Sequence, residues 1–84
     1  MSDVIDNVAK ARYELVIDGH MSVADYTRRD GSVLITHVEV PESLRGKGVA
    51  AQLMAGVVSD AKTRKLTVVP VCSYAVSYLQ RHPQ

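Results

Sequence analysis

The spacing of apolar and polar residues predicts three β-strands in the first half of the chain. The stretches "RYELVI", "HMSVADYTR" and "SVLITHVEV" are separated by Asp18-Gly19 and by Asp30-Gly31. Asp-Gly is favoured in two-residue hairpin turns because both central residues take positive φ, which glycine allows freely and aspartate tolerates. Two such turns predict a three-stranded antiparallel meander.

The two turns also predict a register, in which Arg12 lies opposite Asp25 and Val23 lies opposite Val38. One sheet face then carries Tyr13, Leu15, Ile17, Ala24, Tyr26 and Ile35, and the other carries Val16, Met21, Val23, Leu34, Val38 and Val40. Because both faces are partly apolar, we expect both to be covered. A β-bulge would shift this register locally, and nothing in the sequence decides whether one is present.

From Gly46 onward the apolar period becomes that of a helix, which runs to the cations of "KTRK". The stripe on this helix consists of Val49, Leu53, Val57 and Ala61, with Ala50, Met54 and Val58 beside it. A short buried strand is predicted over Leu66 to Pro70, followed by a short helix "SYAVSYLQR" with Ser73 as its cap. Strand, helix and strand in this order favour a right-handed crossover that sets the last strand parallel to the third.

The predicted fold class is therefore α/β (α+β). It comprises a small mixed sheet (the antiparallel meander plus one parallel strand), a long central helix and a short C-terminal helix. A chain of 84 residues is one domain near the size at which a single core is marginal. We expect that domain to span residues 1–84, with residues 1–9 as a candidate disordered segment.

Charge and cysteine content narrow the function classes. The net charge is +1 and the cations are dispersed, so neither nucleic acid nor an acidic membrane surface is indicated as a partner. Cys72 is the single cysteine, which excludes an internal disulfide. Three scattered histidines with one cysteine do not make a metal site. No apolar run has the length of a membrane span and no signal core is present, so a cytoplasmic enzyme or binding module is expected.

The run "RGKG" from Arg45 to Gly48 stands at the predicted start of the long helix. Amides at a helix start lack partners within the helix and lie at its positive end. A loop without Cβ atoms lets a phosphate approach these amides closely. The alternative is that the glycines only allow a tight turn.

The run Arg45-Gly46-Lys47-Gly48-Val49-Ala50 matches R-x-x-G-x-A, the acetyl-CoA pyrophosphate motif of the GNAT (Gcn5-related N-acetyltransferase) superfamily. With "VPVCSYAVSYLQRHP" near the C-terminus, the chain resembles the small single-domain branch that has a cysteine after the last strand. The resemblance implies that acetyl-CoA (coenzyme A) is held by Val38, Val40, Arg45, Gly46, Lys47, Gly48, Val49 and Ala50. The backbones of the two valines would flank the pantetheine arm, and the loop amides would hold the pyrophosphate.

The chain departs from the larger GNAT pattern in one respect. Typical members carry helices between their first two strands, which form much of the acceptor-binding wall. Here the turn at Asp18-Gly19 leaves no room for them. We therefore expect the acceptor site to be open or to be completed by a partner, and the open sheet makes a homodimer one such arrangement.

Three residues are candidates for catalysis. Cys72 lies between a predicted strand and a predicted helix start, which would favour a reactive thiolate, and the resemblance marks it as a suspected acetyl-accepting residue. Its alternative role is that of a small core residue. Glu39 and His37 project to one face of a strand, beyond Ile35, and either could act as general base; the alternative is an exposed polar rim. Tyr74 and Tyr78 are interpreted as packing residues, although Tyr78 loosely resembles the tyrosine that protonates the departing sulfur in many GNATs.

The sequence thus predicts an acetyl-CoA-dependent N-acetyltransferase that acts on an unidentified amine acceptor, either a small molecule or a protein lysine, directly or through Cys72. The alternative is a non-catalytic module that binds acetyl-CoA or CoA or pairs with another protein.

Overall fold

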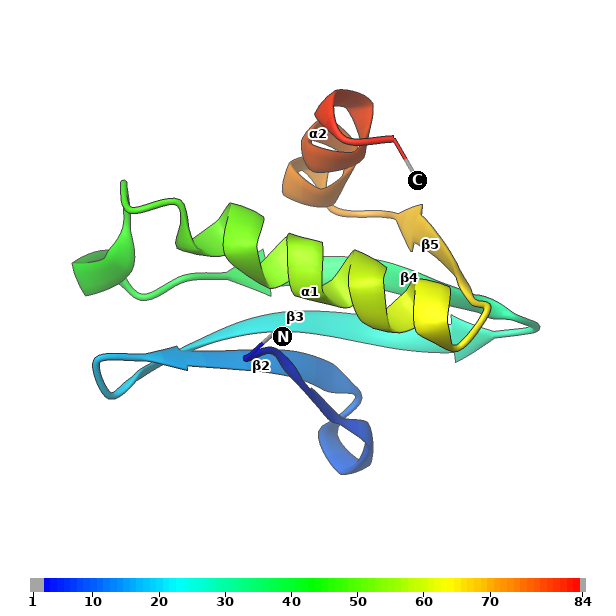
Figure 1. Ribbon diagram of the computed structural model, residues 1–84, viewed down its shortest axis with the longest axis horizontal. Coiled ribbons are helices and arrows are strands. Elements are labelled where there is room, and N and C mark those ends of the chain that lie inside the picture. The colour runs from blue at the N-terminus through cyan, green and yellow to red at the C-terminus, as the bar shows by residue number, and fades with distance from the viewer. Residues whose placement is uncertain (1–2, 84) are drawn as a thin grey trace.

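The computed structural model describes residues 3–83 as a five-stranded mixed sheet with two α-helices (Figure 1). The elements are β1 (Ile5–Asn7), η1 (Val8–Lys10), β2 (Arg12–Ile17), β3 (His20–Arg29), β4 (Ser32–Glu39), η2 (Glu42–Leu44), α1 (Val49–Thr63), β5 (Thr67–Pro70) and α2 (Ser73–Arg81), where η denotes a 3-10 helix. The strand order is β1-β2-β3-β4-β5, and only the pairing of β4 with β5 is parallel among the described strands. The predicted fold class is confirmed, and β1 is an additional strand that the sequence analysis did not identify.

Both predicted hairpins form, but a bulge interrupts the pairing of β3 with β4. Asp25 faces His37 whereas Tyr26 faces Ile35, so Thr36 is an extra residue on β4. The Thr36 hydroxyl donates a hydrogen bond of 3.3 Å to the Asp25 carbonyl at this point. The bulge displaces every later pair by one residue.

The bulge corrects two predictions about β4. Val23 faces Glu39 rather than Val38, because Thr36 takes up one position in the strand. The alternation of side chains is inverted beyond the bulge, so Val38 and Val40 pack against the core instead of sharing the face of Val16. The predicted pairing of Arg12 with Asp25 lies before the bulge and is confirmed.

Helix α1 lies across one face of the sheet, as Figure 1 shows, and buries the predicted stripe. The buried core comprises Tyr13, Leu15, Ala24, Tyr26, Val33, Ile35, Leu44, Val49, Leu53, Met54, Val57, Ala61, Val68 and Ala75. The opposite face was expected to be covered as well, yet Val16 and Met21 remain 55% and 42% exposed. Neither helix between residues 3 and 83 combines the length and the apolar content needed to cross a bilayer.

Helix α2 and its cap begin one residue earlier than predicted. Cys72 is the N-cap, and its sulfur accepts a hydrogen bond of 3.4 Å from the Ala75 amide. Ser73 is the first helical residue instead. The extended backbone of Cys72, with φ −75° and ψ 154°, is typical of an N-cap and places its side chain over the first turn.

The Asp6 carboxylate on β1 connects that short strand to the rest of the fold through a hydrogen bond and ion pairs. Asp6 accepts a hydrogen bond of 2.6 Å from the Tyr26 hydroxyl and one of 3.1 Å from Arg28, and Arg64 lies 3.6 Å away. The Asp6 side chain is only 4% exposed. Burial, and next the hydrogen bond to Asp6, raise the pKa of Tyr26 to about 12. The tyrosine is therefore a stable proton donor to this carboxylate.

Candidate functional site

The parallel pairing of β4 with β5 ends before β4 does. The last paired residues are Ile35 and Pro70, after which the chain turns away from β4 into α2. The amides of Val71 and Cys72 both donate to the Ile35 carbonyl, at 3.0 and 3.1 Å, and mark the point of divergence. Beyond it β4 has, among the described strands, a neighbour on one side only, which leaves the backbone of its last residues open to a ligand.

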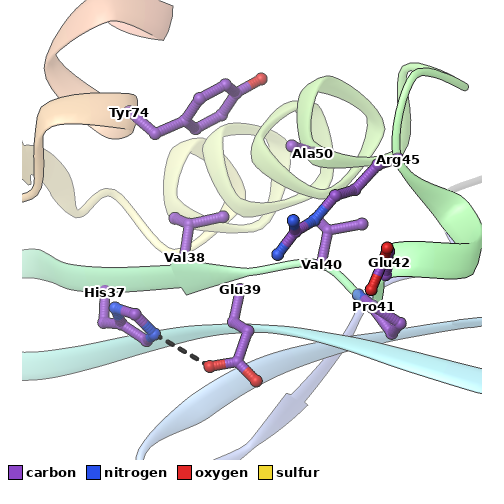
Figure 2. A pocket seen from close by; sticks show the side chains of 9 residues that line it. All are labelled: His37, Val38, Glu39, Val40, Pro41, Glu42, Arg45, Ala50 and Tyr74. Carbon is purple, nitrogen blue, oxygen red and sulfur yellow. Dashed lines mark hydrogen bonds and ion pairs between the residues drawn. The ribbon is translucent and has the colours of Figure 1, made fainter.

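A cavity of about 510 Å³ lies at this divergence, within the size range of small-molecule sites (Figure 2). It is lined by His37, Val38, Glu39, Val40, Pro41, Glu42, Arg45, Ala50 and Tyr74. A second cavity of about 180 Å³ is lined by Val40, Leu44, Arg45, Gly46, Gly48, Val49, Ala50, Ala51 and Tyr74. The shared residues make the two cavities neighbours between the end of β4 and the start of α1.

The loop before α1 presents bare backbone to the smaller cavity. Gly46 and Gly48 have φ of 79° and 73°, a left-handed conformation that glycine adopts without strain. A Cβ atom on either residue would meet no atom within 4 Å. Crowding by the protein itself therefore does not explain why these two residues are glycines. Gly48 is the N-cap of α1 and offers no capping side chain.

The amides of residues 46–51 donate to no acceptor in the described part of the chain. Unsatisfied amides at the positive end of a 15-residue helix attract anions, and the Arg45 side chain reaches both cavities. A phosphate group could therefore bind here with little rearrangement.

The structure brings almost all of the predicted cofactor residues together. Those that line one or both cavities are Val38, Val40, Arg45, Gly46, Gly48, Val49 and Ala50. Lys47 is exposed and lines neither cavity.

His37 and Glu39 also line the larger cavity, but from the other side of β4. Figure 2 shows both side chains pointing away from Val38 and Val40, with the imidazole Nε2 3.2 Å from a Glu39 carboxylate oxygen. Their side chains are 57% and 70% exposed. We expected them on the face of Ile35, and the bulge at the preceding residue moves them to the opposite face.

The third catalytic candidate, Cys72, is not among the residues that line either cavity. Its thiol is partly buried, packs against the core and caps α2.

The structure instead brings Tyr74 to both cavities, although the sequence analysis interpreted it as a packing residue. The sequence feature that could have identified Tyr74 as a cavity residue is its position in the first turn of the helix that follows the diverging strand. Burial raises the pKa of Tyr74. Tyr78 stacks on His82 with ring centroids 4.5 Å apart and lines neither cavity.

The chain was compared with models of known protein families. Residues 12–84 match the family described as GCN5-related N-acetyl-transferase. The chain belongs to this family. The match covers all of the sheet except β1, and it includes both helices and the loop before α1. Membership supports a general acetyltransferase function for this GCN5-related protein. Within residues 3–83, no three His, Cys, Asp or Glu side chains gather closely enough to hold a metal ion.

Proposed function

We propose that this protein binds acetyl-CoA between β4 and α1 and transfers the acetyl group to an amine. The observation that carries the proposal is the uncapped start of α1, whose free amides border a cavity at the divergence of β4 from β5. The amides of residues 46–50, together with Arg45, suit a pyrophosphate. The backbone of β4 at Val38 and Val40 suits the amide groups of a pantetheine arm, because that edge lacks a strand partner.

Lys47 was predicted to contact the same phosphates. Its exposed side chain is next to the free amides in the chain, so we propose that it acts through charge rather than through a fixed contact.

Acetyl-CoA supplies the acetyl group as a thioester, and residues around the larger cavity can accept and donate the protons that the transfer requires. Glu39 or His37 can accept the proton that the amine loses as its nitrogen bonds to the acetyl carbon. Tyr74 can donate its hydroxyl proton to the sulfur that leaves, since its raised pKa keeps the hydroxyl protonated at neutral pH. The residue that accepts the proton of the amine and the residue that protonates the leaving sulfur would then lie on opposite sides of β4.

A covalent route through Cys72 is the second candidate. It is favoured by the position of Cys72 only two residues from Tyr74, at the N-cap of α2. Incubation with acetyl-CoA followed by intact-mass measurement tests this route. An acetyl adduct that is absent in Cys72→Ser supports it, whereas amine acetylation at the wild-type rate by Cys72→Ser rejects it.

Titration of isotope-labelled protein with CoA tests the binding proposal. We expect the amide signals of residues 46–50 to shift, and Arg45→Gln to weaken binding about tenfold through loss of a charge-assisted contact. Arg29→Gln is the matched control, because Arg29 is an exposed arginine at the far end of β3 and should bind CoA like the wild type. Unshifted loop signals at millimolar CoA would reject the proposal.

Release of free CoA in the presence of a panel of amines separates an enzyme from a non-catalytic module. Binding without release for any amine would favour the module. A homodimer and a cytoplasmic location remain predictions from the sequence, and sedimentation at the concentration of the activity assay tests the first.

A further inference from the structure

The N-terminal part of the described chain forms a separate strap along one edge of the sheet. We define the strap as residues 3–11, which contain β1 and η1. In the order of the described strands β1 is at the edge and pairs with β2 alone. The family match begins at Arg12, directly after the strap, and includes the rest of the sheet. The strap can therefore leave its place without dividing the matched part of the fold.

The contacts that hold the strap do not depend on which copy of the chain supplies it. Asp6, whose side chain is 4% exposed, accepts the hydrogen bond of 2.6 Å from Tyr26, and Val4 packs against the core. On the outer side of the strap, Ile5 and Val8 are 64% and 66% exposed. The strap of a second copy could make the same contacts along the same edge of β2.

The link between β1 and β2 is strained. Residues 8–11 are exposed, and Ala11 ends the 3-10 turn with φ 51° and ψ 52°. This left-handed conformation disfavours an alanine by a factor of about five to thirty. The Ala11 amide donates a hydrogen bond of 3.1 Å to the Val8 carbonyl, which closes the turn. Extension of the link releases the strain, lets water replace this surface hydrogen bond and provides a span of about 13 Å over four residues.

We propose that two copies of this chain exchange their straps, so that β1 of each copy pairs with β2 of the other. The exchanged dimer keeps the contacts of the strap and differs from the monomer in its links. A short link holds the strap at an effective concentration of about 1 mM, and relief of strain in two links favours the dimer by about 25- to 900-fold. The expected dissociation constant is therefore about 1–40 µM. Both cavities border β4 and α1, away from the edge that β1 occupies, so this inference is independent of the proposed function.

A disulfide between facing positions of β1 and β2 distinguishes the two arrangements. Ile5 faces Glu14 in this antiparallel pair, at a separation that a disulfide can bridge. The test uses Ile5→Cys/Glu14→Cys with Cys72→Ser, equilibrated in reduced form at about 0.1 and 500 µM and then oxidised rapidly. On denaturing electrophoresis we expect disulfide-linked dimers at the higher concentration and intramolecular disulfides at the lower one. Ile5→Cys with Cys72→Ser is the matched control, because its single thiol reports random collisions.

Intramolecular disulfides alone at both concentrations would overturn the proposal, even if the protein sedimented as a dimer. That result would mean that the copies associate through another surface. Linked dimers no more abundant than those of the single-thiol control would overturn it as well.

Substitutions at Ala11 give a second measurement, by sedimentation equilibrium. Ala11→Gly accepts the left-handed conformation without strain, which favours the closed link and should weaken the dimer at least about tenfold. Ala11→Pro fixes φ at about −65° and removes the hydrogen bond to Val8, so it should strengthen the dimer. Ala9→Gly is the matched control, since Ala9 lies in the same turn without a positive φ and should change the dissociation constant by less than about threefold. A wild-type protein that stays monomeric at about 500 µM, or a dimer that Ala11→Gly leaves unchanged, would reject strand exchange.

Discussion

Replacing Gly48 with alanine separates a role in the turn from a role in ligand binding. Gly48 has φ of 73°, and an alanine in this left-handed region costs about 1–2 kcal/mol. Its Cβ would meet no atom of the protein within 4 Å, so we expect no further cost from crowding. That Cβ would project beside the smaller cavity, among the free amides before α1. We therefore expect Gly48→Ala to fold with a stability lowered by about 1–2 kcal/mol.

Binding of CoA should suffer more than stability does in Gly48→Ala. Loss of one or two hydrogen bonds between loop amides and a charged phosphate, each worth about 1.5–3 kcal/mol, predicts an affinity at least about tenfold weaker. Calorimetric titration with CoA measures this effect, and urea denaturation measures the stability. Gly19→Ala is the control, since Gly19 has φ of 76° and equally open surroundings in a hairpin turn. If the two variants bound CoA equally well, the glycine at position 48 would serve the turn alone and the proposed phosphate contact would be wrong.

Three further predictions concern stability. Because the pKa of Tyr26 lies at about 12 in the folded protein and at 10.0 ordinarily, the unfolded chain loses this proton first as pH rises. The contribution of Tyr26 to stability should be retained below pH 10 and be lost, by about 2–3 kcal/mol, as the pH approaches 12. Because burial also raises the pKa of Tyr13, Tyr26→Phe should make the fall in stability shallower in denaturation curves rather than abolish it. Asp6→Ala should cost about 1–3 kcal/mol by denaturation, because it leaves the Tyr26 hydroxyl without its acceptor and removes the carboxylate that Arg28 pairs with, whereas exposed Asp3→Ala should change stability by less than about 0.5 kcal/mol. Cys72→Ala should lower the melting temperature by removing an N-cap worth about 0.5–1 kcal/mol, and Cys72→Ser, which keeps a capping atom, should not.

Local signals predicted much of the sheet. The two Asp-Gly turns set the hairpins and the pairing of Arg12 with Asp25, since a two-residue turn determines which residues face each other. The helical period likewise predicted which face of α1 is buried. Strand β1 escaped detection because three residues, Ile5–Asn7, are too few to show a period, and its attachment depends on the distant partners of Asp6.

The candidate site was predictable in its loop and less so in its side chains. The glycines and Arg45 belong to one contiguous motif, and a contiguous motif keeps its geometry in the fold. The faces of His37 and Val38 depended on whether a bulge lies before them, and threonine at position 36 fits a regular strand as well as a bulge. Tyr74 reached the cavities through the packing of α2 beside the end of β4, a tertiary relation that no local pattern encodes.

The extra residue in β4 determines which of the later side chains in the strand face α1. With Thr36 present, Val38 and Val40 lie three and five positions after the core residue Ile35, one position more than side chains on the same face of a regular strand would have. Removing Thr36 would remove the bulge and leave Ile35, Val38 and Val40 in regular alternation on the face toward α1, with His37 and Glu39 on the opposite face. We therefore expect deletion of Thr36 alone to be tolerated, whereas deletion of both Thr36 and His37 would turn Val38 and Val40 to the opposite face.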